Sequence, residues 1–446
     1  MSAAAAVGFP KWVLLEPYVF RRDDDKSFPD DIDALFRASG TTSWGADFRI
    51  AFSLTDPPSI SHLYAHLPGF PGPDEQEPLE MVATHRHLSL LCVGTQTPSG
   101  VVQNFFIFRA DENKPSSSSL TALPPCTVPR RYGYSRIRPG RPPSNATPHL
   151  LDTISSGLWC GDKEEFVVAE LTTISFPTLA GCGRTKAFAN ICSLRSSFTD
   201  DQLAPCKWHT MRVPILSTTD DDLLKLAHWQ TDTVIPFQRW LCWIDYHQGI
   251  LFWDVSEKAD ISFLWFPPDK YSLASTHTTP CSGNGAVSVV DDGRLLKFVY
   301  VARQDGCLAY GAPKPGTGFA ITCYTLVLGG SVKWKEDYTV TSDDLPDHHL
   351  HRGLPLFPRV DIVRPQVVHS LFIEFGKLYE KMSVLSINMS TKTVESFYPY
   401  MDGNELLQPG PTTVDIDFIR TKSMYGIPAP FLPCEFPSWF RYCSRF

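Results

Sequence analysis

The stretch LCWIDYHQGILFWDV, residues 241–255, decides the fold class of this chain. Two runs rich in β-branched and aromatic residues surround the polar turn His247-Gln248-Gly249, in which Gly249 can supply the positive φ of a tight turn. Apolar residues alternate onto both faces of the runs, as Leu241 and Trp243 do with Cys242 and Ile244. This pattern is typical of an inner strand pair that is covered on both sides. The stretch therefore predicts a buried β-hairpin.

Similar strand signals recur outward from this hairpin at roughly 45 to 60 residues, a period expected of propeller blades. Units at 286–302, 319–340 and 364–400 each contain strands joined by polar turns. The 38 prolines and 28 glycines disfavour long helices, and only residues 220–228 predict a short helix, capped by aspartates. We expect an all-β protein, a β-propeller of about six blades, with two packed β-domains as the alternative.

Three parts are predicted along the 446 residues. Residues 1–114 and 150–446 are β-rich, and residues 115–149 form a flexible loop or linker rich in proline and serine. Residues 12–20 are the strand expected to pair with strands from the other terminus. The loop contains five arginines: Arg130, Arg131, Arg136, Arg138 and Arg141. They suggest a nuclear-import or anion-binding patch, but we favour a solvated loop.

Composition excludes several classes of partner. The formal net charge of -8 disfavours a broad grip on nucleic acid. No apolar run approaches the roughly 18 to 20 residues that span a bilayer, and the start lacks the pattern of a signal peptide. We expect a soluble, monomeric protein of the cytoplasm or nucleus. Its 12 cysteines, scattered singly in apolar runs, are expected to be small buried hydrophobic residues.

No catalytic, cofactor-binding or metal-binding residue is predicted, and no cofactor. Residues 181–186 imitate a phosphate loop but lack its frame, so we expect a tight loop. Cys206 with His209 supplies only two ligands, and the histidines 348, 349 and 351 are expected in a solvated loop. Asp245 and His247 can be a base and its orienter. We favour a structural reading, in which Asp245 caps the turn and His247 lies at an exposed tip.

The hairpin 243–255 resembles the signature of a grass-expanded plant family with a domain of unknown function, DUF1618. Residues 12–17, 38–43 and 166–171 are similar to further segments of that family. Trp253 departs from the pattern, where a smaller residue such as cysteine is expected, and this puts the local blade packing in question. The resemblance implies no activity. The repeats are also similar to the propeller domain that follows F-box motifs, but the first 45 residues contain no F-box, so an adaptor role is not supported.

The sequence favours a non-enzymatic protein-interaction module whose protein partner it does not identify. The alternative is an enzyme whose active site lies in a central channel and is invisible to motif analysis. Converging carboxylates or histidines in a pocket would favour the enzyme. An aromatic-rich face with a polar rim would favour the binding module.

Overall fold

The computed structural model is almost entirely β-strand, with one α-helix among the residues it describes. It describes residues 12–24, 26–29, 36–71, 78–97, 100–110, 118–128, 150–161, 164–177, 186–199, 202–216, 219–256, 260–267, 283–305, 317–328, 332–345, 350, 353–374, 381–401 and 432–434. Every statement on absence below refers to these residues.

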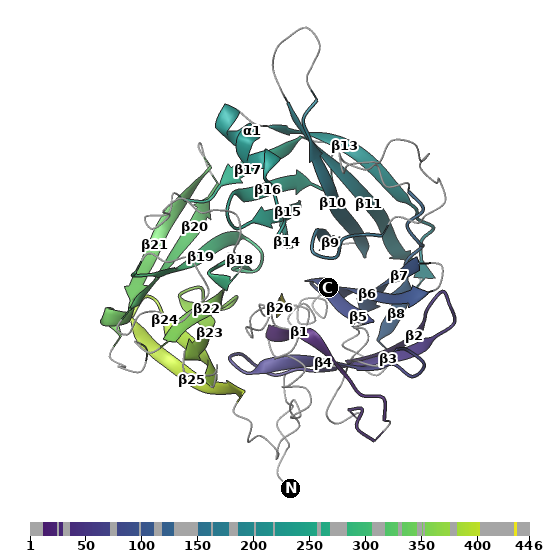
Figure 1. The fold of residues 1–446 in the computed structure, drawn as a ribbon, viewed down its shortest axis with the longest axis horizontal. Helices are drawn as coiled ribbons and strands as arrows, with labels where there is room; N and C mark the ends of the chain where they lie inside the picture. Colours follow the sequence, from purple (N-terminus) through teal and green to yellow (C-terminus); the bar gives the residue numbers. More distant parts are fainter. Residues whose placement is uncertain are drawn as a thin grey trace. The chain divides into compact units, whose positions relative to one another are not determined.

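The strands fall into antiparallel groups that follow the chain (Figure 1). A five-stranded sheet has the order β2-β3-β4-β1-β26. Its strands are β1 (Val13–Arg21), β2 (Phe36–Thr41), β3 (Asp47–Ser53), β4 (Ile60–His66) and β26 (Leu432–Cys434). A four-stranded sheet follows, formed by β5 (Leu79–His85), β6 (Leu88–Thr97), β7 (Gly100–Arg109) and β8 (Ser119–Ala122).

A nine-stranded sheet contains two further groups, joined by a short parallel pairing of β13 with β17. The first group is β9 (Ser156–Cys160), β10 (Glu165–Ser175), β11 (Ala187–Thr199), β12 (Gln202–Leu203) and β13 (Trp208–Leu216). The second is β14 (Thr233–Phe237), β15 (Trp240–Asp245), β16 (Gly249–Asp254) and β17 (Ile261–Trp265).

Two more four-stranded sheets complete the described chain. One consists of β18 (Gly285–Val290), β19 (Leu295–Arg303), β20 (Phe319–Val327) and β21 (Lys333–Thr341). The other consists of β22 (Gly353–Val360), β23 (Val367–Glu374), β24 (Lys381–Asn388) and β25 (Thr393–Met401). The predicted all-β class is confirmed, and the described strands form six groups of four or five, the unit from which propeller blades are made.

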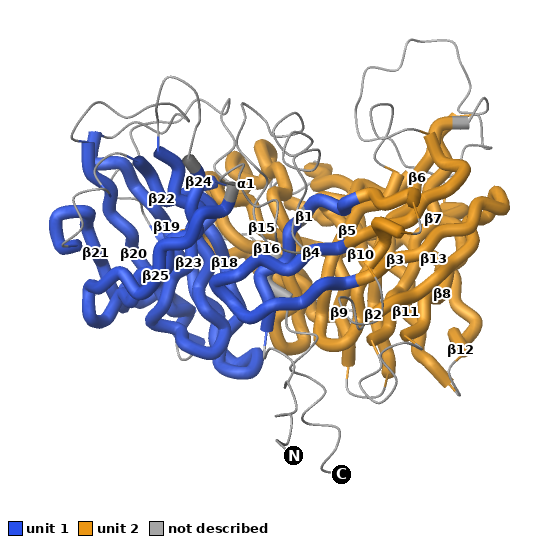
Figure 2. The backbone as a smooth tube through the Cα atoms, turned by 90° about the horizontal axis from the view of Figure 1, so that it is seen from below, with its two compact units in different colours: residues 1–20, 52–63, 267–446 blue, residues 21–51, 64–266 orange. Residues whose placement is uncertain are grey.

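The chain divides into two compact units, coloured separately in Figure 2. Unit 1 comprises residues 1–20, 52–63 and 267–446, and unit 2 comprises residues 21–51 and 64–266. In unit 1, buried residues of β18–β21 and β22–β25 form one hydrophobic core. In unit 2, the β9–β13 group contributes to two cores, one shared with β5–β8 and one shared with β14–β17.

The predicted hairpin is β15 and β16, with Trp240 opposite Asp254 and Asp245 opposite Gly249. The residues predicted to lie on its two faces, from Leu241 to Ile244, are all fully buried. The predicted positive φ of Gly249 is wrong, because Gly249 is absent from the described glycines with positive φ. A Cβ atom at this position would instead meet the Leu264 carbonyl oxygen at 2.2 Å. The neighbouring strand β17 therefore requires glycine here.

Other local predictions have clear outcomes. The predicted helix is α1 (Asp220–Ala227), but its N-cap is Thr219, which forms a capping box with Asp222. The predicted pairing of the chain's two terminal regions is present, since β1 pairs with β26 and Val13 lies opposite Cys434. Four residues of the predicted loop 115–149 form β8, and residues 111–117 and 129–149 lie outside the described residues. The proposed three-part division itself stays a prediction.

Candidate functional site

Asp245 has the structural role expected of it at the turn of the central hairpin. The Asp245 carboxylate accepts hydrogen bonds from the backbone N–H groups of His247, at 2.9 Å, and Gln230, at 2.8 Å. Burial raises the pKa of Asp245, although these hydrogen bonds lower it. The expectation of an exposed His247 is wrong, because its side chain is half-buried. Asp245 thus serves to fix the backbone of the hairpin.

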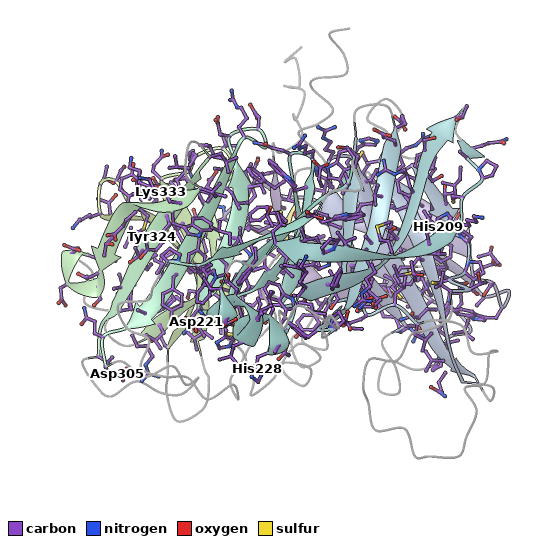
Figure 3. The ribbon with its side chains drawn as sticks, turned by 90° about the horizontal axis from the view of Figure 1, so that it is seen from above. His209, Asp221, His228, Asp305, Tyr324 and Lys333 are labelled. Atoms are coloured by element: carbon purple, nitrogen blue, oxygen red, sulfur yellow. The ribbon has the colours of Figure 1, made fainter. Side chains whose placement is uncertain are left out.

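The weak ligand candidates do not converge. Cys206 packs against the hydrophobic core of unit 2, whereas His209 on β13 is exposed (Figure 3). Among the described residues, no three histidine, cysteine or acidic side chains are placed to hold a metal ion. The histidines 348, 349 and 351, residues 181–185 and the five loop arginines lie outside the described residues.

Unit 1 contains a relay of an acid, a histidine and a serine that sequence analysis did not find. On β23, the His369 Nδ1 atom lies 2.8 Å from the Ser386 hydroxyl of β24, and the Nε2 atom lies 3.3 Å from the Asp361 carboxylate. Ser396 donates a further hydrogen bond to Ser386 at 2.7 Å. The same residue types activate a serine in acyl-transfer enzymes. Such activation requires a serine hydroxyl that a substrate can reach.

This relay is sealed inside the sheet. Asp361, His369 and Ser386 are all buried, and the Trp12 ring lies against the imidazole with 5.7 Å between ring centroids. Burial raises the pKa of Asp361, but the hydrogen bonds from His369 and from the Arg364 backbone contribute to a larger opposite effect. The pKa of Asp361 is therefore lowered overall. Asp361 also caps the turn before β23. The Ser386 hydroxyl is therefore not presented at the surface, and the relay joins neighbouring strands.

A different kind of site lies at α1 in unit 2. The helix has one side attached to β17, beside which it lies in Figure 1. Leu226 is buried in the core shared by β9–β13 and β14–β17. The indole N–H of Trp265 donates to the Asp222 carboxylate at 2.5 Å, and the Lys225 ammonium lies 3.4 Å from the centroid of the same indole ring. These contacts hold α1 at a fixed position.

Aromatic rings continue from this anchor along the helix. Trp265 contacts Phe263, and Phe263 contacts Trp229 edge to face, with centroid distances of 5.9 and 6.1 Å. All three side chains are partly exposed. Burial lowers the pKa of Lys225, against the opposing effect of nearby carboxylates such as Asp221. The ring contacts of Trp229, Phe263 and Trp265 form what we call the aromatic platform beside the helix.

The outward side of α1 combines apolar and acidic side chains. Leu224 is 64% exposed and Leu216, at the end of β13, is 55% exposed. Asp220 and Asp221 are exposed at the start of the helix, and Asp221 and His228 mark its two ends in Figure 3. We call the exposed side chains of the helix and its C-cap the α1 surface: Asp220, Asp221, Leu224 and His228. A large apolar side chain held outward with a charged rim is typical of a protein-binding surface.

Part of the α1 surface had a signal in the sequence. The pattern of residues 220–228 predicted the helix, and its 3.6-residue period separates Leu226 from Leu224. No local signal brings Trp265 to Asp222, because 43 positions separate them. The aromatic platform joins Phe263 and Trp265 of β17 to Trp229, which follows α1 in the chain.

One family model matches part of the chain. Residues 243–369 match the family described as "Protein of unknown function (DUF1618)". This match starts within β15 and ends at His369, so it includes the second half of β15 and all of β16. A comparison with curated proteins gave no match.

One solved structure to which the chain is similar is an α-L-arabinanase of Penicillium chrysogenum complexed with arabinobiose. The identity is 9%, the alignment covers 86% of this chain and 84% of that chain, and the TM-score is 0.26. A likeness at this score carries no argument about arrangement or activity. Among the described residues, no helix is long and apolar enough to cross a membrane.

Proposed function

We propose that this chain is a non-enzymatic protein-interaction module that binds its partner through the α1 surface. The observation that carries the proposal is the exposed Leu224 on a helix whose opposite side is fixed by Asp222 and Lys225 to Trp265. A preorganised apolar anchor costs little conformational entropy on binding, and this supports a docking role. The sealed position of Ser386 speaks against the alternative of acyl-transfer catalysis.

The proposed partner is a protein segment that covers Leu224 with an apolar side chain and brings a lysine or arginine to the helix start. Asp220 and Asp221 are exposed there, and Lys225, the basic residue of the helix, is turned toward Trp265. Such charge complementarity gives specificity and fast association. We further propose a soluble, monomeric plant protein of the cytoplasm or nucleus that binds neither nucleic acid nor membranes, with β-rich parts at 1–114 and 150–446 joined by residues 115–149.

The test compares Leu224→Asp with Ile154→Asp as bait proteins in native tissue extracts. Ile154 is a matched control, because it is 58% exposed and belongs to the same unit. We expect partners recovered with the unmodified protein and with Ile154→Asp to be lost with Leu224→Asp, while the melting temperatures of both variants stay level. Recovery of the same proteins with all three baits would refute binding through the α1 surface.

The charge part of the proposal has its own test. Replacing Asp220 and Asp221 by asparagine is expected to weaken the recovered complex about 2-fold to 10-fold at low salt and to reduce its salt dependence. An unchanged affinity for the double variant would leave Leu224 as an anchor but refute the cationic partner.

A further inference from the structure

Five cysteine side chains contribute to the core that unit 2 forms between β5–β8 and β9–β13. Within this core, the Sγ atoms of Cys126 and Cys192 lie 3.7 Å apart, although 66 positions separate the two residues in the chain. Both side chains are buried thiols. The cluster consists of Cys92, Cys126, Cys160, Cys192 and the partly buried Cys206. The sequence, in which these cysteines are isolated from one another, gave no sign of this contact.

Two hydrogen bonds, one to β7 and one from β13, hold the residues just before Cys126. The Leu123 backbone N–H donates to the Phe105 carbonyl of β7 at 2.8 Å, and the Trp208 indole N–H of β13 donates to the Pro124 carbonyl at 2.8 Å. Cys192 lies in the middle of β11, opposite Glu170 and Thr210. The two sulfurs are therefore brought together from two different strand groups by fixed anchors.

The sulfurs are close enough for a covalent bond after a small movement. A disulfide bond is about 2.05 Å long, so the Sγ atoms must approach by about 1.7 Å. Rotation of the Cys126 side chain, combined with a small shift of its irregular segment, can supply this approach. Cys126 follows β8 and lies outside any strand, whereas Cys192 is held by pairing on both sides.

The two thiols are not equivalent. Cys126 is 8% exposed and Cys192 is fully buried. The hydrogen bond with Cys126, burial and the nearby Glu170 carboxylate all raise the pKa of Cys192. Cys192 thus keeps its proton and can donate a hydrogen bond to Cys126, and Cys126, the more exposed thiol of the pair, is the sulfur that meets the oxidant.

We propose that Cys126 and Cys192 form a two-electron oxidation site that takes a hydroperoxide and yields an intramolecular disulfide. The Cys126 thiol gives up its proton as its sulfur attacks the terminal peroxide oxygen, and the O–O bond breaks. The departing oxygen takes up that proton, so a sulfenic acid forms with release of an alcohol, or of water where the oxidant is hydrogen peroxide. The Cys192 sulfur then attacks the Cys126 sulfur, the S–S bond forms, the S–O bond breaks, and the leaving hydroxide takes the Cys192 proton as water. In sum, two thiols and one hydroperoxide give one disulfide, one water and one alcohol, and with hydrogen peroxide the alcohol is replaced by a second water.

The disulfide changes the behaviour of unit 2. It links the chain after β8 to β11 across 65 intervening residues, which restricts the unfolded chain strongly. It also ties the β5–β8 sheet to the β9–β13 group covalently, in addition to the shared hydrophobic core. We infer that oxidation raises the melting temperature by several degrees and opposes local separation of these two groups. This site is independent of the α1 surface.

The experiment uses the reduced full chain, treated with hydrogen peroxide at a few equivalents, then alkylated and digested with trypsin without reduction. Trypsin releases Cys126 in residues 110–130 and Cys192 in residues 187–195, each as the single cysteine of its peptide. We expect these peptides to appear linked, with a mass two hydrogens below their sum. Cys126→Ala and Cys192→Ala are expected to abolish the link and the rise in melting temperature.

The matched control is Cys92→Ala, which removes a buried thiol of the same core cluster. It is expected to leave the linked peptide and the rise in melting temperature intact. A folded protein in which Cys126 and Cys192 both remain alkylatable thiols after peroxide treatment would overturn the proposal. So would a disulfide that involves Cys206, or a Cys126 sulfenic acid that persists while Cys192 stays reduced.

Discussion

Replacing Glu16 by glutamine is expected to abolish much of the pH dependence of stability near neutrality. Glu16 lies on β1 and is buried in unit 1, where the Tyr400 hydroxyl donates a hydrogen bond to its Oε2 atom. Among the described residues, nothing donates a hydrogen bond to its Oε1 atom. Burial raises the pKa of Glu16 to about 8, although the hydrogen bonds from Tyr400 and from the Tyr18 backbone lower it. Glu16 is therefore a protonated acid at pH 7.

The direction of the pH dependence follows from this raised pKa. In the unfolded chain Glu16 loses its proton near pH 4.5, whereas the folded protein keeps it until about pH 8. The contribution of Glu16 to the free energy of unfolding is fully present below pH 4.5 and falls as the pH rises toward 8. At about 1.4 kcal/mol for each pH unit, an interval of about 3.5 units corresponds to a loss of at most about 5 kcal/mol.

Urea unfolding of the full chain between pH 5 and 8.5, followed by tryptophan fluorescence, measures this loss. Glu16→Gln keeps the shape of the protonated acid and does not titrate, so its stability relative to the unmodified protein is expected to rise with pH. Glu336→Gln is the control, because Glu336 is an exposed carboxylate of the same unit. Its unfolding curves should follow those of the unmodified protein. Parallel pH profiles for Glu16→Gln and the unmodified protein would refute a protonated Glu16.

Three further predictions test the packing and the choice between binding and catalysis. The Trp243 indole donates to the Ser155 carbonyl at 2.9 Å, whereas the buried Trp253 indole N–H has no acceptor among the described residues. Trp243→Phe should therefore cost about 1–3 kcal/mol more in urea unfolding than Trp253→Phe, and equal costs would contradict this. Deleting residues 1–25 removes the partner strand of β26 and should cause aggregation, which a soluble truncated protein with an unchanged melting temperature would disprove. A fluorophosphonate should leave Ser386 unlabelled in the folded protein, and labelling would favour the enzyme.

Local sequence patterns determined much of the secondary structure. The alternation of apolar residues in 241–255 predicted β15 and β16, and the 3.6-residue period of 220–228 predicted α1. Both signals report which side of an element is buried, and that depends on neighbours within a few residues. The departure noted at Trp253 also has a local meaning, since this large side chain is accommodated in the core but leaves its N–H without an acceptor.

Only the tertiary structure decided which distant residues meet. His369 reaches Asp361 and Ser386 because β22, β23 and β24 pair in one particular register, and Cys126 reaches Cys192 because two strand groups share a core. The need for glycine at 249 likewise comes from the close approach of β17, and not from the turn itself. A shift of one residue in strand register would turn His369, Ser386 or Cys192 to the opposite face of its sheet. Sequence periodicity fixes the two faces of a strand, but pairing and packing between distant segments select the partners of each face.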